Sequence, residues 1–211
     1  MFARLRSCTV LSVLVVIGLL SACGGERVSS PGLSGNDASR TNSSGPSSTS
    51  SDDPTFLTAS PSAPSIANPV ISFWAKKGTD RSVRMVYASR PGHNDSTTFL
   101  FFRVRAQSLV ARADGTPLAY GDSLLITVTL VDPVQLKVDF QPSGLRFSAS
   151  HPASLTMSYA ETSPPPPLGA LHIWKQENPL AAWLRLPSQV LSETNEVQAD
   201  ILGFTGYAIA Y

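Results

Sequence analysis

The sequence predicts an all-β fold, an antiparallel β-sandwich or partly closed barrel, preceded by a disordered linker. From residue 69 to residue 211, apolar and polar residues alternate in short runs, which is the period of strands that bury one face. Clusters of Gly, Pro, Asp and Ser separate these runs, as turns do in antiparallel sandwiches and barrels. Before residue 69 the chain is rich in Ser, Gly and Pro and has too little apolar surface to form a core.

The chain begins with residues 1–22, a segment typical of a secretory signal peptide. Two arginines precede an apolar run, residues 10–20, which is shorter than the about 20 residues needed to span a bilayer. The run ends in Leu20-Ser21-Ala22-Cys23, which resembles the lipobox of bacterial lipoproteins. The resemblance implies cleavage between Ala22 and Cys23 and acylation of Cys23, so that chains such as palmitate hold the protein on a membrane. An ordinary cleaved signal and a retained single-span anchor are the alternatives.

The residues around Cys23 also bear on location and redox state. Gly24 follows the cysteine and no Asp stands there, which by resemblance to the usual sorting pattern favours the outer membrane in a two-membrane cell. The other cysteine, Cys8, lies in the signal, so we expect a mature chain without disulfides that depends on core packing. Removal of the signal leaves 14 of the 16 basic residues against 15 acidic ones, a net charge of −1, without a basic patch for nucleic acid.

The predicted linker, residues 23–68, holds the acylated cysteine and then the Ser/Gly/Pro-rich stretch. Such a composition cannot offset the entropy of ordering, so we expect a disordered leash. About 45 residues of flexible chain have an r.m.s. span of roughly 35–40 Å, enough to lift a domain off the headgroups. Phe56 and Leu57 form an isolated apolar pair in this stretch, and we assign them no structural role.

One domain, residues 69–211, follows the linker and is long enough for a single core. In each alternating run the apolar positions predict the core face, for example Leu124, Ile126 and Val128. A turn is expected at Pro142-Ser143-Gly144. The predicted strands are 70–74, 83–88, 100–110, 123–131, 134–140, 155–159, 171–174, 183–186, 197–201 and 207–211.

Four segments within residues 121–211 carry a further pattern. They are Phe140-Gln141-Pro142-Ser143-Gly144-Leu145-Arg146-Phe147, Pro152-Ala153-Ser154-Leu155-Thr156-Met157-Ser158-Tyr159, Trp183-Leu184-Arg185-Leu186-Pro187-Ser188 and Phe204-Thr205-Gly206-Tyr207-Ala208-Ile209-Ala210. In this order they resemble the bacterial form of the ZU-five domain, which also occurs in ankyrins, netrin receptors and tight-junction scaffolds. The resemblance implies a β-sandwich whose activity is non-catalytic contact with proteins.

The aromatic and hydroxyl residues of these segments have their own physical reading. Tyr159 and Tyr207 are expected in the core, where their hydroxyls need a partner. Some relatives of the ZU-five domain cut themselves at a His-Phe-Ser sequence near the end, where this chain has Gly203-Phe204-Thr205. Because Gly203 has no titratable group to activate the Thr205 hydroxyl, we predict no self-cleavage.

Three tryptophans are the candidate binding residues. Trp174 and Trp183 flank a polar turn, and Trp74 stands close to two lysines. Exposed tryptophans are frequent at the centre of interfaces, although core packing explains buried ones equally well. The three histidines, His93, His151 and His172, are far apart and lack the spacing of a zinc site. We therefore predict no metal site, no cofactor and no enzymatic activity.

These features together predict a lipid-anchored extracytoplasmic protein of the cell envelope. The anchor and the leash would hold a non-catalytic β domain near the membrane, where weak contacts with an envelope protein gain from high effective concentration. A carbohydrate-binding or hydrolytic surface protein is the alternative, but no pair of Asp or Glu residues forms a convincing hydrolytic constellation. The sequence leaves the partner and the oligomeric state open.

Overall fold

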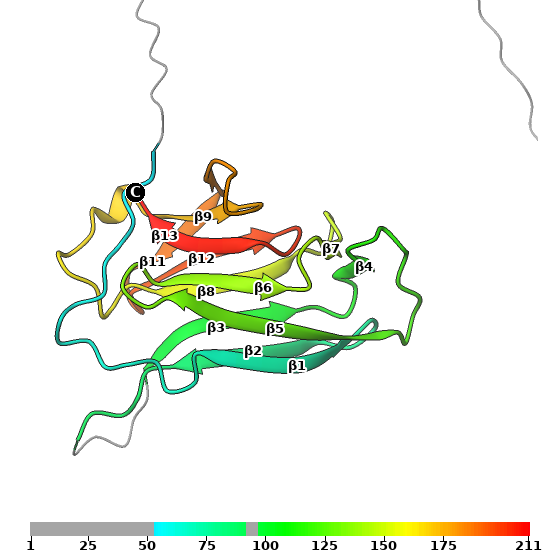
Figure 1. The fold of residues 1–211 in the computed structure, drawn as a ribbon, viewed down its shortest axis with the longest axis horizontal. Coiled ribbons are helices and arrows are strands. Elements are labelled where there is room, and N and C mark those ends of the chain that lie inside the picture. The colour runs from blue at the N-terminus through cyan, green and yellow to red at the C-terminus, as the bar shows by residue number, and fades with distance from the viewer. Residues whose placement is uncertain (1–52, 92–96) are drawn as a thin grey trace, which may run out of the picture. The chain divides into compact units, whose positions relative to one another are not determined.

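The computed structural model describes residues 53–91 and 97–211. The predicted signal peptide, its cleavage site at Ala22, the lipidation site at Cys23 and most of the predicted linker lie outside the described residues. The described part is a β-sandwich of two antiparallel sheets that do not close into a barrel, as the alternation predicts (Figure 1). It contains strands and one short 3-10 helix, η1 (Leu168–Ala170), but no α-helix.

The first sheet has six strands in the order β1-β5-β6-β13-β9-β10, and all neighbours in it are antiparallel. Of these neighbours only β5 and β6, and β9 and β10, are consecutive in the chain, whereas β13, the C-terminal strand, lies between β6 and β9. The bounds are β1 Val70–Lys76, β5 Ser123–Asp132, β6 Lys137–Gln141, β13 Gly206–Ala210, β9 His172–Gln176 and β10 Leu184–Arg185.

The second sheet has five strands in the order β11-β12-β8-β3-β2, also antiparallel. A small two-stranded sheet, β4 with β7, lies at one end of the sandwich. The bounds are β2 Arg81–Val86, β3 Thr98–Val104, β4 Leu109–Ala111, β7 Arg146–Phe147, β8 Ala153–Ser158, β11 Ser188–Leu191 and β12 Glu196–Ile201.

Each of the ten predicted strands has a counterpart in the structure, with two differences. The predicted run 100–110 is two strands, β3 and β4, because a turn closed by the Ser108 N–H on the Arg105 carbonyl (2.9 Å) interrupts it. Strands β7 and β11 were not predicted, since two and four residues are too few to show alternation. The expected turn at Pro142–Gly144 is confirmed, with Gly144 at a φ of +82° that favours glycine.

The core lies between the sheets, where the predicted inward faces meet. In β5, Leu124, Ile126 and Val128 are all buried, while the exposed Leu125 lies on the other face. At the centre, the Phe102 ring of the second sheet packs edge-on against Phe140 of the first sheet at 5.0 Å. Phe204, Phe147, Phe73 and Tyr207 extend this aromatic cluster, with centroid distances between 5.1 and 6.4 Å.

The last part of the predicted linker belongs to the folded domain, which corrects the expected boundary at residue 69. Residues 55–59, here called the strap, lie beside β13 in the first sheet. Thr55 and Tyr211 exchange backbone hydrogen bonds of 2.9 and 3.1 Å, and the Leu57 N–H donates to the Ile209 carbonyl at 3.1 Å. On this side of β13, strand β6 pairs only with Gly206 and Tyr207. The strap pairs with the remaining, C-terminal part of the same side.

The apolar pair in the strap explains why a polar segment adopts this position. Leu57 is buried in the core, and Phe56 lies on the outer face opposite Ala210. The Phe56 ring packs edge-on against Trp183 at 5.0 Å, and the Lys137 ammonium lies 4.0 Å from its centroid. Two apolar side chains and three backbone hydrogen bonds therefore order a stretch whose composition alone predicted disorder.

Replacement of Leu57 by Ala should lower the free energy of unfolding by about 2 kcal/mol, because it removes a buried side chain from the core. Urea or guanidinium unfolding followed by tryptophan fluorescence measures this. The neighbouring Thr58→Ala is the matched control, since the Thr58 side chain is exposed. Equal stability of the two variants would mean that the strap is not part of the cooperative unit.

Candidate binding groove

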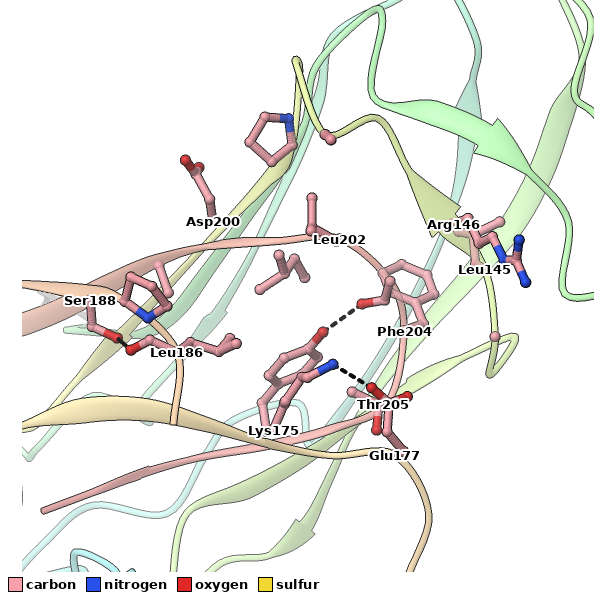
Figure 2. A pocket seen from close by; sticks show the side chains of 18 of the residues that line it. Leu145, Arg146, Lys175, Glu177, Leu186, Ser188, Asp200, Leu202, Phe204 and Thr205 are labelled. Carbon is pink, nitrogen blue, oxygen red and sulfur yellow. Dashed lines mark hydrogen bonds and ion pairs between the residues drawn. The ribbon is translucent and has the colours of Figure 1, made fainter. Parts of the chain in front are cut away.

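A groove lies at one edge of the sandwich, where the chain passes from the first sheet to the second (Figure 2). It has a volume of about 920 Å³, within the range of small-ligand and peptide sites. Its walls come from β9 on one side and from β12 and the residues after it on the other. The crossing segment Leu186–Gln189 closes one end, and Gly144–Arg146 closes the opposite end.

Ser188 fixes the crossing end of the groove. The Leu186 N–H still donates to the Ile173 carbonyl at 2.9 Å, but Pro187 has no N–H with which to continue the pairing. The Ser188 hydroxyl replaces it, accepting from the Ile173 N–H and donating to the Leu186 carbonyl, both at 2.9 Å. Both backbone polar groups of Ile173 in β9 therefore have hydrogen-bond partners, although the chain leaves the first sheet here to begin β11.

The opposite end depends on a close approach of two backbone segments. The Phe204 N–H donates to the Leu145 carbonyl at 3.1 Å, and the Phe147 N–H donates to the Leu202 carbonyl at 2.8 Å. A Cβ atom at residue 203 would lie 2.9 Å from the Leu145 carbonyl oxygen, so only glycine fits there without a backbone shift. Gly203 thus lets the chain after β12 seal the groove.

Tyr207 and Phe204, both almost fully buried, form the base of the groove. The Tyr207 hydroxyl donates a hydrogen bond of 2.5 Å to the Gly203 carbonyl, so this predicted core tyrosine has the partner it needs. Burial, and to a smaller extent the negative charge of Glu177, raises the pKa of the Tyr207 hydroxyl above its usual range. The phenol stays protonated and holds the groove in shape.

The rim of the groove carries charges of both signs. Lys175 and Glu177, on and just after β9, form an ion pair whose ammonium donates to the carboxylate. Asp200 lies on the opposite rim, with one carboxylate oxygen 3.9 Å from the Arg105 guanidinium, and Arg146 stands at the glycine end. Figure 2 shows Lys175 and Glu177 on one side of the pocket, Asp200 on another side, and Arg146 beside Leu145. Such a rim suits a ligand with both donors and acceptors.

The three predicted binding tryptophans lie elsewhere, and none of them lines the groove. Trp174 is 3% exposed and its indole N–H donates to the Ala210 carbonyl at 3.2 Å, so core packing, the alternative for a buried tryptophan, describes this residue. Trp183 is half-buried against Phe56 of the strap. Trp74 is 65% exposed on the outer face of the first sheet.

Sequence reasoning missed the charged groups of the groove, although a signal was present for Lys175. In β9 the side chains alternate, so Lys175 points to the opposite face from Trp174 and reaches the groove. Asp200 and Arg146 gave no signal, because no local pattern shows that their strands meet β9.

The other residues that the sequence analysis weighed for catalysis or metal binding are Thr205 and the histidines. Thr205 is buried, and its hydroxyl donates to the Gln176 carbonyl. The His172 ring contacts the Leu186 carbonyl at 3.2 Å, and His93 lies outside the described residues. Residues 53–91 and 97–211 contain no group of three potential metal ligands. Over the same ranges, no helix has the length and apolar character to cross a membrane.

Comparison of the chain with protein-family models, with curated proteins and with solved structures finds no match. The resemblance to the ZU-five domain therefore stays a prediction.

Replacement of Tyr207 by Phe should lower the free energy of unfolding by about 1 kcal/mol at neutral pH, because the Gly203 carbonyl loses its donor. Above a pH of about 10, the usual tyrosine pKa, the unfolded phenol ionises while the folded one does not. Wild-type stability therefore falls as the pH rises further, and the variant should fall less. Urea unfolding at pH 7 and above pH 10 measures both effects.

Tyr159→Phe is the control at neutral pH. The Tyr159 hydroxyl is also buried but has no hydrogen-bond partner among the described residues, so its removal should cost little or nothing. A Tyr207 variant as stable as this control would contradict the assigned hydrogen bond.

Proposed function

We propose that the chain is a lipid-anchored extracytoplasmic protein whose β-sandwich is a non-catalytic binding module for another envelope protein. We infer that the groove between β9 and β12 receives an extended segment of that partner. The observation that carries this proposal is the groove itself, with an apolar base and a rim of Lys175, Glu177, Arg146 and Asp200. The ZU-five-like pattern, with the protein contact it implies, is consistent with this role.

The chemistry of the groove favours a peptide over a sugar as its ligand. Sugar recognition in this fold would need aromatic ring faces open to stacking, but Phe204 and Tyr207 are 2% and 1% exposed. A peptide backbone presents alternating N–H and C=O groups, which the cationic and anionic side chains of the rim can match as donors and acceptors. Apolar side chains of the same segment would enter the base, where Leu145 and Ile201 lie.

The location rests on Cys23 and the residues before it. Lipid chains on this cysteine would keep the groove within leash length of one membrane, so that even a weak contact with a neighbouring protein is populated. The leash is shorter than the composition predicted, because the strap begins at Thr55 and not at the expected boundary.

A photo-crosslinking side chain at position 202 should capture the partner. Leu202 lines the groove and is 57% exposed, so a probe there reaches a bound segment without entering the core. We expect one protein adduct in intact cells, detected by a mobility shift and mass spectrometry. The double charge reversal Lys175→Glu with Arg146→Glu should reduce the adduct several-fold, because both cationic rim groups become acidic.

Position 134 provides the matched control. Val134 is 58% exposed in the loop between β5 and β6 and does not line the groove, so its probe should give no such adduct. Equal adducts from both positions, or an adduct insensitive to the charge reversal, would contradict binding in the groove. A glycan-array signal that Trp74→Ala abolishes would favour the carbohydrate-binding alternative.

Replacement of Cys23 by Ser should abolish metabolic labelling with palmitate and leave the precursor uncleaved at this site, because the hydroxyl does not replace the acylated thiol. Cys8→Ser is the control and should label like the wild type, since Cys8 lies in the part that is removed. Labelling that persists without Cys23 would disprove the anchor while leaving the groove untouched.

A further inference from the structure

Strand β1 forms one edge of the first sheet, farthest from β9 and β10 (Figure 1). Among the described residues it pairs only with β5, in a regular register from Val70↔Thr129 to Lys76↔Ser123 without a bulge. Seven residues contain no proline, and the only charged side chain is at the end, on Lys76. A long, regular and unblocked edge of this kind is a template for pairing with another strand.

The hydrogen bonds at both ends of β1 show which backbone groups point to the free edge. Leu130 donates to the Pro69 carbonyl at 2.8 Å, and Lys77 donates to the Asp122 carbonyl at 2.9 Å. Antiparallel bonding alternates, so Ile71, Phe73 and Ala75 also bond to β5. The backbone N–H and C=O groups of the intervening residues, Val70, Ser72 and Trp74, therefore point away from the sheet.

The other three edges of the sandwich are blunted, and β1 is not. The β2 edge has a bulge between Met85 and Val86, and Ala67 donates to the Val86 carbonyl, so the preceding chain covers part of it. Strands β10 and β11 are only two and four residues long.

The side chains that accompany the free backbone groups are apolar and exposed. Trp74 and Val70 are 65% and 53% exposed on the outer face of the sheet. Leu125, directly opposite Trp74 on β5, is 47% exposed and widens the apolar surface. Ser72 lies between them and its hydroxyl hydrogen-bonds Thr127 at 2.8 Å.

We propose that β1 pairs antiparallel with β1 of a second copy of this chain, joining two first sheets into one continuous sheet. The two-fold axis passes midway between the two Ser72 residues, so that Ser72 faces Ser72 of the second copy. In this register Trp74 stands opposite Val70 of the second copy, and Val70 opposite its Trp74. The six free backbone groups of Val70, Ser72 and Trp74 find their complements in the same six groups of the other copy.

Strand β1 is complementary to a second β1 in charge and in shape, so we infer that a second copy of the chain binds its free edge. An aromatic residue opposite a β-branched one is a favourable cross-strand pair, and it occurs twice. Lys76 falls opposite Asn68 of the second copy, so no like charges meet. A single pair of strands buries less than the roughly 800 Å² per partner of a standard interface, so we expect a dimer of modest affinity.

Sedimentation equilibrium of the full chain in density-matched detergent, over a concentration series, tests this pairing. The wild type should pass from monomer to dimer. Ser72→Pro removes an N–H that only the second copy uses, and Trp74→Lys places a charge at the edge; each should raise the dimer dissociation constant about tenfold or more. Leu180→Lys, at a 98% exposed leucine of the β9–β10 connection, is the control and should dimerise like the wild type.

Hydrogen exchange of the same samples distinguishes self-pairing from coverage of the edge by the chain's own residues. In the monomer the N–H groups of Val70, Ser72 and Trp74 should exchange fast and those of Phe73 and Ala75 slowly, and dimerisation should slow the first set. A wild type that stays monomeric, variants that dimerise undiminished, or a monomer already protected at Ser72 and Trp74 would each overturn the proposal. None of these results affects the groove, because Trp74 does not line it.

Discussion

The contact between Phe102 and Phe140 is the interaction on which the rest of the domain depends. These two rings belong to different sheets, and Phe204, Phe147 and Tyr207 pack around them. Both cysteines of the chain lie before residue 24, so no covalent link joins the sheets and aromatic packing takes that role. Phe204 and Tyr207 also form the base of the groove, so the packing that holds the sheets together determines the shape of this candidate site.

The alternation of apolar and polar residues was sufficient to predict the sandwich, because every second side chain of a strand with one buried face must be apolar. It predicted the inward faces of β5, β6, β8 and β12. It did not predict the strap, since the isolated pair Phe56 and Leu57 is too short to show a period and its partners are far along the chain. The groove could not be predicted for the same reason, because Lys175 and Asp200 belong to different sheets and line one groove only in the folded chain.

The two surfaces proposed for recognition lie on separate parts of the sandwich and use different physics. The groove would select a partner through the charged side chains on its rim and the apolar side chains at its base. The β1 edge offers backbone groups in a fixed register, and its specificity comes from the side chains that accompany them, Trp74 and Val70. Because β1 and β9 lie near opposite ends of the first sheet, occupation of one surface leaves the other accessible.

The strap determines how the domain would bear mechanical force. It runs antiparallel to β13, and its first residue, Thr55, lies beside the C-terminal Tyr211. A pull from residue 53 that is directed along the strap loads the hydrogen bonds of Thr55 and Leu57 together, in shear. A hairpin pulled apart at its open end breaks such bonds one after another under much smaller loads. With Leu57 seated in the core, tension on this end of the chain would be carried by the domain instead of peeling the strap away.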